Sequence, residues 1–339
     1  MGGDVSVHLP WKRLGQVILL LVALGFLAAL VRGQWSALRA YRWQLAPAWA
    51  LLGLAILGLS WLLEADTWRS ILSDLGGQAK KNPPEGTGRR QALPYGRALQ
   101  AWFLSNIIRY IPGNVWQFLG MVELAAEDGV PRAATLASVV LHQVISTSAG
   151  LLLAAAYFAL AGRGGWVVRL RPFLFAVPLG LLLLQPRVLQ GVLNWILARF
   201  HRPALEVTMT WGRIWLLLLR YIVVWLIQGL AFATLVRALA PLPLAGVPYV
   251  AAAWVAAYVI GFLSLLTPSG LGVREGVIVL LLAAILPQPV AAVIAILARL
   301  WTIAGEAIAA GLALATRRRP AFVPVDTGMP PARRQVADE

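Results

Sequence analysis

Apolar runs long enough to cross a membrane recur along the chain of 339 residues. A helix needs about 20 predominantly apolar residues to span the hydrocarbon core of a bilayer. Runs that meet or approach this length occupy residues 14–31, 47–63, 133–161, 214–236, 247–266 and 290–315, and a shorter one occupies 173–184. The pattern predicts an all-α integral membrane protein, a polytopic bundle of about 6–8 helical elements.

Two of the apolar stretches are interrupted by proline and glycine. The first interruption is "IPGN" within residues 99–128, and the second is "TPSGLG" after the run 247–266. Broken backbone survives at membrane depth only where it is buried in protein or lines a wet cavity. We therefore expect two broken or re-entrant segments, with an ordinary surface loop as the alternative at each break. The expected hinge residues are Pro112, Gly113, Pro268, Gly270 and Gly272.

One interrupted segment falls in each half of the chain. The stretch 277–286, which follows the second break, is too short to span a membrane unaided. Corresponding interruptions in two halves are typical of transporters with inverted repeats and a site near the membrane midplane. The two breaks therefore leave an inverted repeat open as one interpretation of the sequence.

Ionisable residues inside apolar runs indicate a functional site by default. Arg299 and Glu306 lie on one stripe of the last run but two turns apart, so each is expected to pair with another helix. Arg109, Glu123 and Arg274 are the candidate partners. The other in-span candidate is His142, on a stripe of small polar residues that also suits plain helix packing.

The helix after the second break begins with a charged pair, Arg274 and Glu275. Helix N-termini attract anions, and the arginine fork suits phosphate, whereas a local Arg–Glu pair at the helix start is the alternative. The candidate lipid- or anion-binding residues are Arg109, Asn114, Arg274 and Arg299. The candidate charge partners or proton carriers are Glu123, Glu275, Glu306 and His142.

Composition and charge agree with a membrane location. Only 13% of residues are charged, against about 25% in soluble domains. The net charge of +15 fits the positive-inside rule and contact with anionic lipid better than nucleic-acid binding. With no cysteine and three scattered histidines, neither a metal site nor a cofactor is expected.

The charge distribution also suggests an orientation. We expect a cytoplasmic tail at 1–13, a transmembrane domain at 14–316 with a polar cytoplasmic loop at 76–97, and a basic, then disordered cytoplasmic tail at 317–339. Both termini would then face the cytoplasm.

The stretches "RYIPGNVWQ", "EDGV" and "TPSGLGVREG" together resemble the membrane region of lysylphosphatidylglycerol synthases and their stand-alone flippase-like relatives. The resemblance runs over about residues 14–315, with "PSG" where that family usually has "PGG". It implies a polytopic fold with re-entrant helices and a role in lipid handling. Full synthases carry a separate soluble aminoacyltransferase domain at the C-terminus, which we do not expect here, so synthase activity is not expected.

These observations lead to a functional hypothesis. We expect a multi-pass protein of the prokaryotic plasma (inner) membrane that binds and flips an anionic phospholipid or a polyprenyl-phosphate-linked lipid. No P-loop motif occurs, so the movement would be independent of ATP. Membrane lipids are the expected partners, without nucleic acid. The alternatives are an accessory subunit or scaffold for an envelope glycosyltransferase, and a membrane lipid-headgroup transferase.

Overall fold

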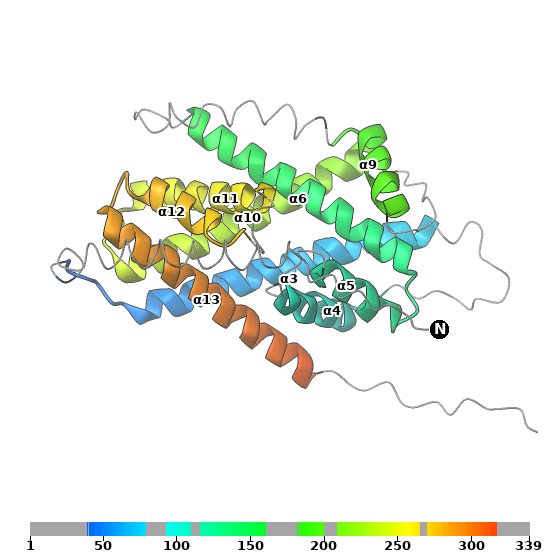
Figure 1. The fold of residues 1–339 in the computed structure, drawn as a ribbon, viewed down its shortest axis with the longest axis horizontal. Coiled ribbons are helices and arrows are strands. Elements are labelled where there is room, and N and C mark those ends of the chain that lie inside the picture. Colours follow the sequence, from blue (N-terminus) through cyan, green and yellow to red (C-terminus); the bar gives the residue numbers. More distant parts are fainter. Residues whose placement is uncertain are drawn as a thin grey trace, which may run out of the picture.

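The computed structural model describes residues 39, 41–78, 93–109, 116–160, 182, 184–199, 209–264 and 270–316. Regular structure within them is helical throughout, so the predicted all-α class is confirmed (Figure 1). The α-helices are α3 (Pro47–Gln78), α4 (Tyr95–Ile108), α5 (Trp116–Ala126), α6 (Arg132–Leu160), α9 (Pro186–Arg199), α10 (Trp211–Leu239), α11 (Val247–Leu263), α12 (Val273–Leu282) and α13 (Gln288–Ala315). These nine somewhat exceed the expected number. The predicted run 14–31, nearly all of the run 173–184, the tails and most of the polar loop lie outside the described residues.

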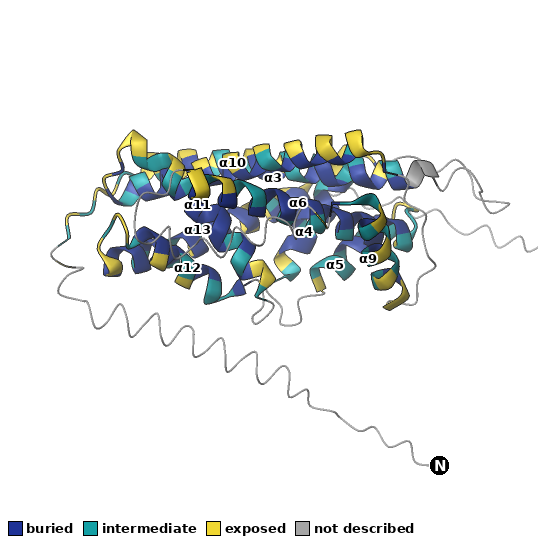
Figure 2. Cartoon of the chain, turned by 90° about the horizontal axis from the view of Figure 1, so that it is seen from above, coloured by how far each residue is buried: buried dark blue, intermediate teal, exposed yellow. Residues whose placement is uncertain are grey.

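Five described helical segments are long and apolar enough to cross a membrane. They are Pro47–Leu75, Arg132–Leu160, Trp211–Leu239, Leu244–Leu263 and Gln288–Ala315. Their outer faces expose large apolar side chains, and Figure 2 shows such exposed residues along α3 and α10. Exposed apolar surface on helices of this length is what contact with lipid requires. The chain is therefore a multi-pass membrane protein.

Besides α9, which has 14 residues, three of the described helices are too short to cross. α4, α5 and α12 contain 14, 11 and 10 residues. At 1.5 Å per residue they reach about 15–21 Å, well short of the roughly 30 Å hydrocarbon core. They lie at the two predicted interruptions: α4 ends before the first and α5 begins after it, while α12 begins after the second. The structure thus ends helices at both breaks.

The helices fall into two similar series. α3–α4–α5–α6 and α10–α11–α12–α13 each consist of a long helix, two shorter helices and a long helix, with 32, 14, 11 and 29 residues in the first series and 29, 17, 10 and 28 in the second. The shorter helix α11 still belongs to a candidate span, because the 3-10 turn before it extends the segment to Leu244–Leu263. The α4–α5 pair and the α11–α12 pair approach the middle of the molecule from opposite ends (Figure 1). This is the helix order that an inverted repeat would give.

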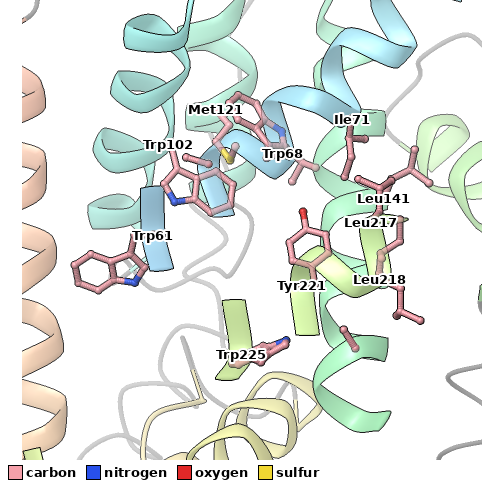
Figure 3. Packing of buried hydrophobic residues seen from close by; sticks show 14 of the residues in the cluster. Trp61, Trp68, Ile71, Trp102, Met121, Leu141, Leu217, Leu218, Tyr221 and Trp225 are labelled. Carbon is pink, nitrogen blue, oxygen red and sulfur yellow. The ribbon is translucent and has the colours of Figure 1, made fainter. Parts of the chain in front are cut away.

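Tryptophan and glycine make matching contacts in the two series. A Cβ on Gly150 of α6 would lie 3.0 Å from the Trp225 indole of α10. A Cβ on Gly305 of α13 would likewise lie 3.0 Å from the Trp61 indole of α3. Both tryptophans belong to the buried centre drawn in Figure 3. Small residues allow this close approach of long helices, as they do in membrane bundles.

Candidate functional site

A cavity of about 350 Å³ lies among the two short-helix pairs and the long helices. Its wall includes α4 and α5 next to the first break, and α11 and α12 next to the second. The charged or titratable residues of the wall are Glu64, Arg109, His142, Tyr258, Arg274 and Arg299. The helices next to the two interruptions therefore border a polar cavity, and a cavity of this kind is the condition under which broken backbone is tolerated in a membrane.

The cavity lies at the mid-depth of the long helices. Trp61, Ser146 and Trp225 all line it. They are the central residues of the candidate spans Pro47–Leu75, Arg132–Leu160 and Trp211–Leu239, respectively. Polar groups at this depth are expensive in lipid and mark transport pathways when they occur.

Arg274 is the most distinctive group in this cavity. Its guanidinium lies 4.3 Å from the Trp254 ring centroid and 3.8 Å from that of Tyr258, and the residue is only 4% exposed. Within the described residues no carboxylate lies within 4.0 Å of it, and its Nε and Nη2 atoms have no hydrogen-bond partner. The aromatic rings hold the guanidinium by cation–π contact but leave its donors for another acceptor.

The other two cavity arginines are paired with carboxylates. Arg109, directly after α4, pairs with Glu306 of α13. Arg299 Nη1 lies 3.5 Å from Glu275 Oε1. The first pair connects the end of α4 to α13, so it joins the two halves of the chain. The second pair connects the consecutive helices α12 and α13. The expectation that Arg299 and Glu306 each have a partner on another helix is confirmed.

Glu275 has a second role at the start of α12. Its Oε2 accepts a hydrogen bond of 2.7 Å from the backbone N–H of Gly272. Gly272 adopts φ +82°, a left-handed conformation that suits glycine and sets the sharp turn into the helix. Glu275 therefore caps its own helix and pairs with Arg299. The alternative of a local Arg274–Glu275 ion pair is not what the structure has.

The predicted site residues divide into three groups. Arg109, His142, Arg274, Arg299 and the hinge residue Gly270 line the cavity, and Glu275 and Glu306 pair with its arginines. Pro112, Gly113, Asn114 and Pro268 lie outside the described residues. Gly272 lies at the N-terminus of α12. Glu123 does not line the cavity: its side chain is 60% exposed and pairs with Arg132 at 2.7 Å, because it lies in the second half of α5, away from the first break.

Sequence reasoning missed Glu64. It lines the cavity, with its Oε2 accepting from Gln228 Nε2 at 3.4 Å and its Oε1 lying 4.0 Å from His142 Nε2. The apolar run was ended at residue 63, although the helix was expected to run on through Trp68 and Arg69, so this carboxylate was not counted among the charges inside a span. The helix continues to Gln78, and the residue is close to the middle of a candidate span. A charge within reach of an apolar run was the signal that could have found it.

Neutralising Glu123 tests its placement outside the cavity. Glu123→Gln should change neither the function of the cavity nor, to any large extent, the free energy of unfolding, since exposed ion pairs contribute little. The measurement is thermal unfolding in detergent together with an assay of function. A loss of function in a folded Glu123→Gln variant would show that Glu123 is a functional residue.

Gly270 should tolerate no side chain. It adopts φ +64°, and a Cβ there would lie 2.8 Å from backbone atoms of Gly261 in α11. Gly270→Ala should therefore lower the free energy of unfolding by about 2 kcal/mol or more, since the left-handed strain alone costs about 1–2 kcal/mol. Gly276→Ala in α12 is the control, because a Cβ there meets nothing within 4 Å. Equal melting temperatures for the two variants would contradict this account of the turn at Gly270.

Comparison with known proteins places the chain in a family. A family model described as "Lysylphosphatidylglycerol synthase TM region" matches residues 16–310. No curated protein and no solved structure matches the chain. The matched range contains both interruptions, all five candidate spans up to residue 310 and every residue that lines the cavity. The chain thus belongs to the lysylphosphatidylglycerol synthase TM region family, which ties this membrane protein to lipid handling.

Proposed function

We propose that this protein moves an anionic lipid between the leaflets of a membrane by passing its phosphate group through the central cavity. The observation that carries the proposal is Arg274: a buried cation at mid-depth, with no carboxylate within 4.0 Å among the described residues. A charge in such a place is costly unless a counter-ion joins it. A lipid phosphate is the counter-ion that the bilayer supplies.

The geometry around Arg274 suits a phosphate better than a carboxylate side chain of the protein. A guanidinium presents a planar fork of donors that matches phosphate oxygens in pairs. The Trp254 and Tyr258 rings fix the plane of that fork, so little rotamer freedom is lost on binding. Anionic phospholipids and polyprenyl phosphates both carry such a group on an apolar chain, and the cavity chemistry is common to the two.

The helix arrangement supports movement rather than static binding. Two short-helix pairs reach the cavity from opposite ends of the molecule (Figure 1), and both are next to proline–glycine breaks. Such elements allow a central site to open alternately to either side. No P-loop motif is found in the sequence, and we propose movement without ATP, in the inner membrane of a prokaryote with both termini in the cytoplasm.

Leaflet exchange in proteoliposomes tests the proposal. Purified protein is reconstituted with fluorescent phosphatidylglycerol, a labelled polyprenyl phosphate or fluorescent phosphatidylcholine, and the outer-leaflet label is quenched chemically. The wild-type protein should accelerate exchange of at least one anionic lipid at least about tenfold over protein-free vesicles, and more than that of the zwitterionic lipid. A well-folded protein that exchanges none of them would overturn the proposal and favour an accessory role beside another envelope enzyme.

A further inference from the structure

A second group of titratable side chains lies at the cavity, apart from the arginines. His142 Nδ1 is 2.6 Å from the Tyr221 hydroxyl, and His142 Nε2 is 4.0 Å from Glu64 Oε1. The three residues come from three different long helices, α6, α10 and α3. The Trp102 ring packs edge-on against the imidazole at 4.9 Å between ring centroids. The packing of these helices therefore holds a carboxylate, an imidazole and a phenol in one chain of contacts.

Glu64 differs from the other two carboxylates near the cavity. Glu275 and Glu306 each pair with an arginine, whereas no arginine or lysine lies within 4.0 Å of Glu64 among the described residues. Its side chain is 16% exposed. A carboxylate so deep in a membrane protein is costly when charged and unpaired. Binding a proton removes that charge, and the neighbouring imidazole places a ring nitrogen 4.0 Å away that can share the proton.

The charge count of the cavity links this group to Arg274. Two arginines are balanced by Glu306 and Glu275, which leaves Arg274 as a cation and Glu64 as an anion. The Tyr258 phenol lies within electrostatic range of both. One proton bound at the Glu64 group makes the cavity more positive by one charge. An anionic headgroup then binds more favourably, and by reciprocity a bound headgroup favours the proton.

We infer that Glu64, His142 and Tyr221 form a proton-binding site whose occupancy is coupled to binding of the anionic headgroup at Arg274. The inference rests on the proposed function, which it extends by naming the coupled ion. One proton joins the site as the headgroup binds, and it leaves again as the headgroup leaves. A proton gradient across the membrane would then bias the direction in which the lipid moves.

Other titratable and charged groups face Glu64 from the helices packed around it. Arg109, after α4, lies within electrostatic range of it. The remaining groups around the cavity are Arg274 and Glu275 of α12, Tyr258 of α11, and Arg299 and Glu306 of α13. The arginines stay charged at all relevant pH values, and Glu275 and Glu306 are each paired with one of them, so we assign a change of charge near neutral pH to the Glu64 group.

The test measures lipid affinity against pH. Fluorescent phosphatidylglycerol in detergent micelles is titrated with wild-type protein, Glu64→Gln and the surface control Glu123→Gln. Wild type and control should bind about tenfold more tightly at the acidic end of the titration than at the alkaline end. Glu64→Gln, which mimics the protonated carboxyl, should bind with the acidic affinity at every pH. Wild-type pH dependence in a folded Glu64→Gln would overturn the inference.

A second variant and a second readout keep the result decisive. His142→Gln removes the imidazole and should move the pH at which affinity changes. Proton uptake on adding lipid to weakly buffered wild-type protein should be detectable with a pH dye and absent in Glu64→Gln. If neither variant alters the pH dependence, the inference fails even though exchange occurs. If pH-linked binding is present and vesicles show no exchange, the transport proposal fails alone.

Discussion

Replacing Arg274 by alanine is expected to reduce anionic lipid exchange by about 10- to 150-fold. This range corresponds to the loss of one charge-assisted hydrogen-bonding group, about 1.5–3 kcal/mol. The reason is that Arg274 is the cavity cation that lacks a carboxylate within 4.0 Å in the described part of the chain. Arg274→Lys should recover only part of the rate, since lysine has neither the planar fork nor the stacking on Trp254 and Tyr258.

The control for Arg274 is an arginine of the surface. Arg132→Ala removes the same charge from an exposed pair with Glu123 and should leave the exchange rate unchanged. Both variants are first checked for folding by size-exclusion chromatography and thermal unfolding in detergent. Exchange at the wild-type rate in folded Arg274→Ala would remove this residue from the pathway.

Replacing Arg109 by alanine is expected to cause the largest loss of stability, about 3–5 kcal/mol, because it leaves a buried carboxylate without its counter-ion. Glu306 is only 2% exposed, so water cannot replace the guanidinium. Thermal unfolding in detergent gives the shift. The double variant Arg109→Ala with Glu306→Gln should recover much of the loss, since neutral partners need no counter-ion.

Two outcomes would contradict that reading of the Arg109–Glu306 pair. One is a single variant as stable as the wild type. The other is a double variant no more stable than Arg109→Ala alone, which would mean that the arginine acts through contacts other than the pair. The surface variant Arg132→Ala is the comparison and should unfold at nearly the wild-type temperature, since its ion pair is exposed.

The fold class and the positions of the two breaks could be predicted from the sequence because both depend on local chemistry. Apolar runs need lipid or a core, and proline followed by glycine disfavours the interior of a helix. For the same reason Arg274 could be placed at the start of a short helix from "TPSGLGVREG" alone. The partner of each buried charge was predictable only as a set of candidates, since the pairs depend on how the helices pack.

The end of α3 could not be predicted because its polar residues are balanced by a distant helix. The apolar run stops at residue 63, yet the helix continues through Asp66 and Asp74. Arg220 and Arg213 of α10 pair with these two carboxylates, the latter pair at 2.7 Å. Ion pairs between antiparallel long helices thus extend the helix beyond its apolar run. Glu64 was lost from the predicted site for this reason.

Glu123 lies away from the cavity arginines that it was expected to pair with, and the cause is related. An acidic residue in an apolar stretch looked like an in-span charge, but α5 is only 11 residues long and Glu123 lies past its middle. There it meets Arg132 at the first residue of α6, away from the cavity. Knowing that a break exists does not fix the direction in which the next helix leaves it, and that direction decides which face reaches the site.

The most direct test of the account asks whether a lipid headgroup enters the cavity at mid-depth. A photoreactive benzophenone side chain is placed at Thr147, which lines the cavity, or at Leu226, a half-exposed residue next to the central Trp225 on the outer face of α10. Protein in phosphatidylglycerol vesicles is irradiated, and mass spectrometry locates the bond on the lipid. The account predicts attachment to the headgroup at Thr147 and to acyl chains at Leu226. Acyl attachment alone at both positions, or no adduct at Thr147, would contradict it.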